Sequence, residues 1–432
     1  MSEHQIPRPA PPRRTAGWLL FAAVVLIAIN LRMTITAVGP LLDQIGDDEG
    51  LSPAVLGLLS SVPLLSWAAF SPFSHWVGSR LGMTSAVSWA LVALALGTLL
   101  RSLTGSHVNL WAGTALIGLG LAVTNVLMPA VIKREFPTRV PLLMGVYTAA
   151  LSAMAALAAG IAVPLSALPL DSGEPAGWRF ALIMMGAPIP LAIAVWLIAT
   201  RGRRRLAAPR PGEGAILAAE PLAGLAAESF CPTDESRPPA GRRIWRDSLA
   251  WQVSLYMGSQ SVVFYTISGW FASSQIAHGL SATAAGAQIM MYQLIGIGGS
   301  LLLPLLARDL RVRRWLPALI PAFGLIAWVG IPLAPAAMPL WIVMAGLTAG
   351  ASLTISLTLM AMRSRTSEQA SALSGMAQAV GYLVAAAGPL LFGVLLGATG
   401  NWILPFSIIW LTGIAQLLLG VSVGRPRFVL ER

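Results

Sequence analysis

Apolar stretches of about twenty residues recur twelve times along this chain, and they constrain its fold more than any other feature. A bilayer core about 30 Å thick needs a helix of about twenty apolar residues to cross it. Charged residues make up only 10% of the chain, against about 25% in a typical soluble protein, which is too few to cover a soluble surface. We therefore predict an all-α integral membrane protein with twelve transmembrane helices, over residues 17–42, 53–77, 84–101, 108–131, 140–165, 178–200, 248–274, 282–307, 315–334, 339–362, 372–397 and 402–423.

The connections between these stretches alternate in charge. Residues 1–16 contain three arginines, whereas the next connection is purely acidic, with Asp43, Asp47, Asp48 and Glu49. Every second connection thereafter is basic, and basic loops stay on the cytoplasmic side of a membrane. We therefore expect both termini in the cytoplasm. The same distribution explains the net charge of +11 without a nucleic-acid surface, so no nucleic-acid partner is expected.

One long polar stretch divides the twelve helices into six and six. Membrane proteins built from two such halves place the substrate site at their interface, near the midplane. The predicted organisation is a cytoplasmic tail at 1–16, a six-helix bundle at 17–200, a cytoplasmic linker at 201–247, a second six-helix bundle at 248–423 and a cytoplasmic tail at 424–432.

Several classes of protein are disfavoured by what the sequence lacks. Cys231 is the single cysteine, so the chain forms no internal disulfide and no Cys-x-x-Cys metal site. No Gly-x-x-x-x-Gly-Lys-Ser/Thr loop is present, so ATP is not expected to drive the protein directly. The first apolar stretch is too long for a signal peptide and is expected to remain as a helix. No catalytic dyad lies within the spans, so we expect neither an enzyme nor a cofactor.

Arg32 is the most informative single residue. It lies about fifteen residues into the first span, about 20 Å from the cytoplasmic edge at 1.5 Å per residue. Burying an arginine at that depth costs about 2.5–3.5 kcal/mol on insertion scales, and the interior of the twelve spans contains no Asp or Glu to offset it. An anionic substrate would supply the missing charge through two hydrogen bonds to the guanidinium. The alternative is a structural arginine bonded to carbonyls, to amide side chains or to Asp43.

Other polar side chains within the spans are candidates to surround the substrate. Asn30 is two residues from Arg32 and so lies on another face of the helix, which means that only one of the two points straight into a cavity. Gln378 and Tyr382 share a helix face at a spacing of four residues. Each candidate has an alternative role in bonding between helices. Together with Arg32, the candidate site residues are Asn30, Asn125, Tyr147, Gln260, Tyr265, Gln293, Gln378 and Tyr382.

Bland helices, meaning those almost without polar side chains, should lie at the periphery of the bundle. The tryptophans that lie deep in two spans have two interpretations. The spans 178–200 and 315–334 carry almost no strongly polar side chain, so we expect them to face lipid. Trp67 and Trp270 lie deeper in their spans than the tryptophans at span ends. Packing in the core is their expected role, and stacking on a planar substrate is the alternative.

A coupling ion is not evident in the sequence. Many proton-coupled carriers use an Asp, Glu or His relay within the membrane, but the four histidines lie near span ends or in the tails. A proton remains the coupling ion that we expect if transport is coupled. It would then be carried by the substrate itself or by edge groups such as Asp43 and Glu135.

Twelve spans, a six-plus-six division and a long central loop resemble the major facilitator superfamily. The superfamily motif after the second helix is matched only in part, by Ser79-Arg80-Leu81-Gly82-Met83, where Ser79 replaces the usual Asp. The antiporter motif of the fifth helix is matched poorly by Gly160-Ile-Ala-Val-Pro164, which weakens a proton-antiport interpretation.

Further segments resemble the cyanate-permease and nitroimidazole-transporter family. This resemblance runs from the first to the eleventh helix and implies transport, but its members are assigned to small anions as well as to neutral nitroaromatics. The matching segments are Asn30-Leu-Arg32, Thr36-Ala-Val-Gly-Pro40, Asn125-Val-Leu-Met-Pro129, Ile132-Lys-Arg-Glu-Phe-Pro137, Gly145-Val-Tyr147, Ala250-Trp251-Gln252, Gly258-Ser-Gln260, Phe264-Tyr265, Leu373-Ser-Gly-Met-Ala-Gln378, Gly381-Tyr382 and Gly388-Pro389.

We therefore expect a secondary transporter of the bacterial inner membrane that works by alternating access, as a monomer in the lipid bilayer. Arg32 would hold a small anion or a compact polar organic solute, with cyanate as the example from the family. The alternative is an efflux transporter of neutral aromatic or nitroheterocyclic toxicants. Two weaker alternatives are an intramembrane enzyme and a membrane sensor that signals through the linker at 201–247.

Overall fold

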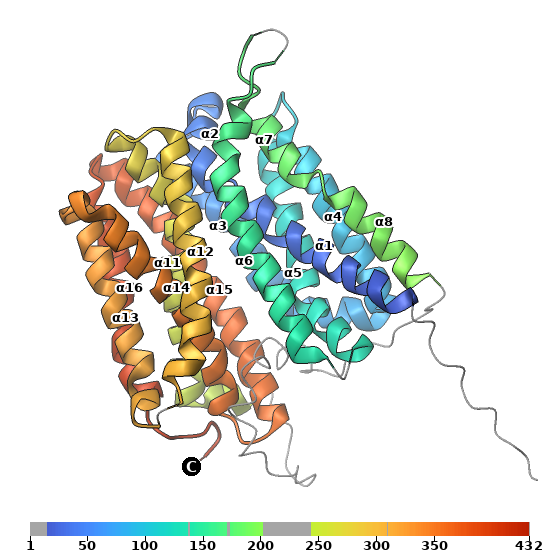
Figure 1. Cartoon of the computed structure of the whole chain (residues 1–432), viewed down its shortest axis with the longest axis vertical. Coiled ribbons are helices and arrows are strands. Elements are labelled where there is room, and N and C mark those ends of the chain that lie inside the picture. Colours follow the sequence, from blue (N-terminus) through green and yellow to red (C-terminus); the bar gives the residue numbers. More distant parts are fainter. Residues whose placement is uncertain (1–14, 137–138, 171–172, 202–242, 309, 432) are drawn as a thin grey trace, which may run out of the picture.

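A computed structural model describes residues 15–136, 139–170, 173–201, 243–308 and 310–431, and these residues are almost entirely helical (Figure 1). Most of the predicted linker at 201–247 and of the first tail, with Cys231, lies outside the described residues. The long helices are α1 (Thr15–Thr36), α3 (Pro53–Leu81), α4 (Met83–Ser102), α5 (His107–Glu135), α6 (Val140–Ser166), α7 (Gly177–Gly186), α8 (Ile189–Thr200), α11 (Ser248–Ala277), α12 (Ala282–Leu306), α13 (Leu310–Leu333), α14 (Met338–Met362), α15 (Ser367–Thr399) and α16 (Ile403–Val423), with short turns η1 (Gly39–Leu41), η4 (Ile244–Arg246) and η5 (Pro335–Ala337).

The predicted all-helical membrane fold is confirmed, and one helix differs in character from the rest. Within the described residues, eleven helical segments are long and apolar enough to cross a membrane. The predicted span at 248–274 corresponds to α11, which at 30 residues is long enough. It falls short in apolarity because serines and glutamines recur along it, although most of its side chains are buried by other helices.

One predicted boundary is wrong, and one predicted span has the expected bounds but contains a break. The acidic connection after the first span is helical rather than a loop, because α2 (Leu42–Glu49) continues from α1 through η1 and ends at Gly50 in the left-handed conformation, with φ 62°. The sixth span, predicted at 178–200, runs over Gly177–Thr200 and consists of α7 followed by α8. Pro188 and Pro190 lie at the break, where their missing N–H groups interrupt the helical hydrogen bonds.

The bland helices lie at the periphery, as predicted. Figure 1 shows α13 and α16 on one flank of the molecule and α4 and α8 on the other. On α13, large apolar side chains are exposed at helical spacing, including Trp315, Leu319, Phe323 and Ile326. Such a stripe would face lipid.

Small residues allow two helices of the second half to touch backbone to backbone. A Cβ added at Gly350 in α14 would overlap the carbonyl oxygen of Gly296 in α12. Ser300 also donates a hydrogen bond of 3.1 Å to the carbonyl of Gly350. Close approach of this kind is typical of helix pairs in membranes.

We expect Gly350→Val to destabilise this packing. Backbone atoms on both sides cannot move aside, and overpacking a tight contact costs about 1–3 kcal/mol. The matched control is Gly298→Val, because a Cβ at Gly298 meets only the Leu347 side chain, at 3.9 Å. Thermal unfolding in detergent should show a melting temperature lowered by several degrees for Gly350→Val alone. Equal melting temperatures for the two variants would contradict the packing argument.

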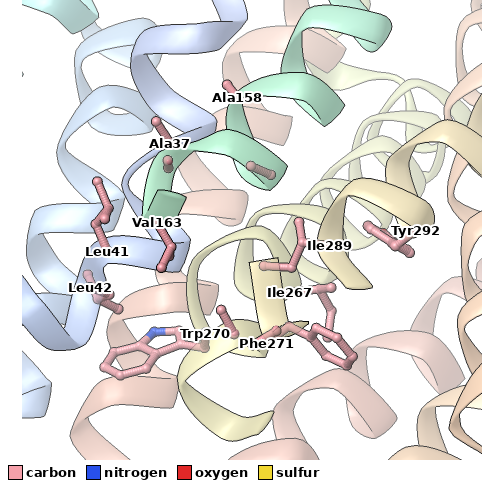
Figure 2. Close-up of a cluster of buried hydrophobic side chains, with 14 of the residues drawn as sticks. Ala37, Leu41, Leu42, Ala158, Val163, Ile267, Trp270, Phe271, Ile289 and Tyr292 are labelled. Atoms are coloured by element: carbon pink, nitrogen blue, oxygen red, sulfur yellow. The ribbon is translucent and has the colours of Figure 1, made fainter. Parts of the chain in front are cut away.

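The two groups of helices, 15–201 and 243–431, contact each other most closely at one face. We call the face at which α1 begins and α16 ends the termini face, and the opposite face the distal face (Figure 1). Near the distal face, a Cβ at Gly39 would overlap the carbonyl oxygen of Ser268, and one at Gly57 would overlap that of Pro389. Figure 2 shows the apolar cluster that fills this contact, with labelled side chains from the turn after α1, from η1, α2, α6, α11 and α12.

Toward the termini face, two glycines of the described residues meet no other helix. Gly145, near the start of α6, and Gly375, near the start of α15, would each accept a Cβ with no atom of another helix within 4 Å. The two groups of helices are therefore in close contact near the distal face, whereas the described residues show open space beside Gly145 and Gly375 toward the termini face. That the termini face is cytoplasmic stays a prediction.

Candidate functional site

A cavity of about 210 Å³ lies between the two groups of helices, at mid-depth and toward the termini face. The helices that line it are α1, α5 and α6 from the first group and α11, α12, α14 and α15 from the second. Its polar lining residues are Arg32, Asn125, Tyr147, Thr148, Ser152, Gln260, Ser261, Tyr265, Tyr292, Gln293, Ser300, Gln378 and Tyr382.

Arg32, in the last turns of α1, is held at the junction of the two groups. Its Nη1 donates a hydrogen bond of 3.1 Å to the hydroxyl of Tyr265 in α11. Its guanidinium carbon also lies 5.9 Å from the ring centroids of both Trp67 and Phe264. Cation–π contacts of this kind partly compensate a cation that has left water.

Aromatic rings hold Arg32 and its neighbours in place. Trp67, only 2% exposed, packs edge-on against Tyr382 at 4.9 Å and Tyr265 at 6.1 Å between ring centroids. Phe264 packs edge-on against Tyr265 at 5.1 Å. These contacts come from α3, α11 and α15, so the orientation of the site depends on both groups of helices.

The cavity contains a positive charge that no carboxylate balances. Of its described lining residues Arg32 is the only charged one, and none is Asp or Glu. Arg179, a basic residue near the start of α7, instead forms ion pairs with Asp48 and Glu49 near the distal face. A buried, unbalanced cation attracts anions strongly because the surroundings screen it poorly.

The amide side chains around the cavity make few competing hydrogen bonds. Gln260 donates 2.7 Å to Ser261 Oγ, and Gln378 donates 3.1 Å to Ser374 Oγ. Gln293 in α12 donates 3.4 Å to the carbonyl of Ala155 in α6, so it joins the two groups of helices. Asn125 is half-buried and lines the same space.

Asn30 is the one predicted site residue that the structure does not bring to the cavity. It is fully buried and donates 2.7 Å to the carbonyl of Leu26 in its own helix. Two residues correspond to about 200° around a helix, so Asn30 points away when Arg32 points in. The expectation that only one of the two reaches the cavity is met.

Several lining residues were not singled out from the sequence. Tyr292 and Phe264 line the cavity, and Tyr292 was recognisable only as a partner of Gln288 at a spacing of four residues. Four of the five tyrosines of the chain line this space, and Tyr147 and Tyr292 have buried hydroxyls that find no partner among the described residues. A cluster of tyrosines on the inner faces of helices is the sequence signal from which this part of the lining could be predicted.

The two deep tryptophans and the edge carboxylates lie outside the cavity lining. Trp270 donates 2.9 Å to the carbonyl of Pro389 and stacks on Phe392, which is core packing. Asp43 in α2 is near the distal face, and Glu135 ends α5 at the termini face. Neither carboxylate lines the central cavity.

Comparison with known sequences identifies relatives along nearly the whole chain. The model of the Major Facilitator Superfamily matches residues 20–389. A 2-nitroimidazole transporter of Escherichia coli K12 is 36% identical over 409 residues, which is 95% of this chain and 96% of that protein. The cyanate transport protein CynX of the same organism is 26% identical over 410 residues, 95% of this chain and 98% of that protein.

Solved structures show the same fold. The D-xylose–proton symporter superposes with a TM-score of 0.71 at 14% identity, covering 95% of this chain and 98% of that one. A bacterial homolog of the human lysosomal transporter Spinster, in an inward-facing and unoccupied conformation, also gives a TM-score of 0.71, at 17% identity, with 96% of each chain covered. The family and these relatives are transporters and not enzymes. The chain therefore belongs to the Major Facilitator Superfamily of small-solute transporters and resembles, within it, the 2-nitroimidazole and cyanate transporters.

Proposed function

We propose that this protein is a secondary transporter of the bacterial inner membrane that carries a small anion or a compact polar organic solute by alternating access. In the proposed cycle the two groups of helices rock around the central cavity, opening it to the termini face and then to the distal face. The monomer, with the central cavity between its two halves, would be the working unit.

The observation that carries this proposal is the position of Arg32. Its guanidinium lies in a cavity with no described carboxylate, and only one of its nitrogen atoms, Nη1, has a hydrogen-bond acceptor among the described residues. The remaining N–H groups form a planar fork that suits a carboxylate or another anion. Gln260, Gln378 and Tyr382 line the same space and supply hydrogen bonds that orient the rest of the solute.

The size of the cavity favours the larger members of this class. A volume of 210 Å³ holds several water-sized groups, since a water molecule occupies about 30 Å³. It is smaller than the pockets of about 300–1,000 Å³ that take drug-sized ligands. A compact organic solute with one anionic or strongly electron-rich group fits these limits, and a triatomic anion would enter with accompanying water.

Efflux of neutral nitroheterocycles is the second candidate. The tyrosines and Phe264 give the cavity aromatic walls, and a relative at 36% identity is named a 2-nitroimidazole transporter. In that case Arg32 would bind the oxygen atoms of a nitro group rather than a full negative charge. The two candidates differ in how strongly binding depends on the charge of Arg32.

A thermal-shift screen of the purified protein separates the two. Small anions and neutral nitroheterocycles are tested at about a hundred times their dissociation constants, where a bound ligand stabilises the protein by about 2.7 kcal/mol. We expect anions to raise the melting temperature of the wild type and not of Arg32→Gln. Stabilisation by neutral compounds that persists in Arg32→Gln would favour the efflux candidate and overturn the anion proposal.

A further inference from the structure

A second buried arginine lies between the central cavity and the distal face. Arg101, in the last turn of α4, is 2% exposed. Its Nη1 donates 2.9 Å to the carbonyl of Thr34 in α1, but its Nε and Nη2 are buried and have no partner among the described residues. In the sequence Arg101 is an unremarkable basic residue at the end of a span, so only the close packing of α4 on α5, where a Cβ at Gly113 would overlap the backbone of Arg101, reveals its burial.

Arg101 lines a small cavity of about 40 Å³. Two further lining residues, Ser60 of α3 and Ser268 of α11, have buried hydroxyls that also find no partner among the described residues. Thr114 of α5 lines it as well, and no described lining residue is Asp or Glu. Buried polar groups are nearly always satisfied by protein, water or an ion, and four unsatisfied donor atoms from three residues around one space indicate an acceptor.

Tyr265 separates this small cavity from the central one. It lines both spaces, and its hydroxyl accepts the hydrogen bond from Arg32. The two arginines therefore line two different cavities that share Tyr265 as a wall. In the proposed alternating-access cycle, opening of the distal face would separate the contacts of α3 and η1 with the second group and place the small cavity on the route to that face.

We propose that Arg101, Ser60 and Ser268 form a second anion site, distal to Tyr265, which the transported anion occupies between the distal face and Arg32. The ligand is a small monovalent anion, because 40 Å³ holds no more than a few atoms of a solute. A larger solute places only its anionic group there once the distal face opens. The identity of this anion as the substrate rests on the function proposed for the central cavity.

Equilibrium binding of radiolabelled cyanate to the full-length purified protein tests the site. We expect two anions per wild-type chain and one in each of Arg101→Gln and Arg32→Gln. Because Arg101→Gln also loses the bond to Thr34, Ser268→Ala serves as a second variant that leaves that bond intact. It should weaken the second site several-fold. Its matched control is Thr266→Val in the same helix, which removes another buried, unpartnered hydroxyl that does not line the cavity.

The outcomes separate this inference from the proposed function. A single anion that is lost only in Arg32→Gln would overturn the second site, which water alone would then fill, and leave the proposed function standing. Binding that is lost only in Arg101→Gln would instead overturn the central anion site and support the distal one.

Transport in oriented proteoliposomes tests whether the anion at this site is the substrate. We expect the KM of Arg101→Gln to rise about tenfold for substrate offered at the distal face, a loss of about 1.4 kcal/mol, and to stay within twofold for substrate offered at the termini face. An unchanged KM at both faces would overturn the proposal that the transported anion passes through this site. A site that binds only chloride would give that result.

Discussion

Arg32→Gln is expected to reduce the transport of an anionic substrate by about 100-fold or more. A hydrogen bond to a charged group contributes about 1.5–3 kcal/mol, and the substitution removes the charge together with the fork that would bind two oxygen atoms. Arg32→Lys keeps the charge but presents a point rather than a plane, so we expect a loss of about tenfold. Initial rates of uptake into proteoliposomes, measured over a range of substrate concentrations, give kcat/KM for each variant.

The matched control is Arg308→Gln, which removes the same charge from an exposed position at the end of α12. It should transport at the wild-type rate. The melting temperature of Arg32→Gln without substrate should not fall, because the variant no longer buries a cation that no carboxylate balances. If Arg32→Gln carries every tested anion as fast as the wild type, Arg32 is a structural arginine and the anion proposal fails.

Much of the candidate site was predictable because polar atoms are costly inside a membrane. Eight of the nine predicted site residues line the central cavity, Asn30 being the exception. Within an apolar helix, an arginine, an amide or a tyrosine is retained only where another group or a solute satisfies it. The sequence therefore marks such residues without an account of how the helices pack.

What the sequence could not predict depends on how helices meet. Arg101 ends a span, where arginines usually reach the interface, and its burial follows only from the packing of α4 against α5 and from the bond of its side chain to Thr34. Phe264 and Trp67 are indistinguishable from core residues until their rings are placed around Arg32. The break between α7 and α8 was likewise missed, although Pro188 and Pro190 mark it in the sequence.

α11 is less apolar than the other spans because it lies at the centre of the molecule. Hydropathy ranks it below the other spans, yet it contributes Gln260, Ser261 and Tyr265 to the central cavity and Ser268 to the small one. A helix enclosed by others and by a hydrated route does not need to be apolar all round. Composition alone therefore underestimates the helices that matter most for transport.

Gly57→Val is expected to shift the protein away from the conformation described here and to slow transport strongly. A Cβ at Gly57 in α3 would overlap the carbonyl oxygen of Pro389 in α15 and lie 3.1 Å from the Cα of Leu390. Both are backbone atoms, so the clash is relieved only if the two groups of helices separate at the distal face. Because overpacking costs about 1–3 kcal/mol and applies to this conformation alone, the ratio of the two conformations should change by about 5–150-fold.

Spin labels measure this shift directly. With Cys231 replaced, labels at Ser52, which precedes α3, and at Thr399, which ends α15, report the separation of the two groups at the distal face. Both positions are exposed. We expect Gly57→Val to move the distance distribution to longer values and to lower uptake at least tenfold, whereas Gly298→Val, whose Cβ meets only one side-chain atom at 3.9 Å, should change neither. A wild-type distance distribution in Gly57→Val would mean that this contact does not hold the distal face closed, and alternating access would then need a different hinge.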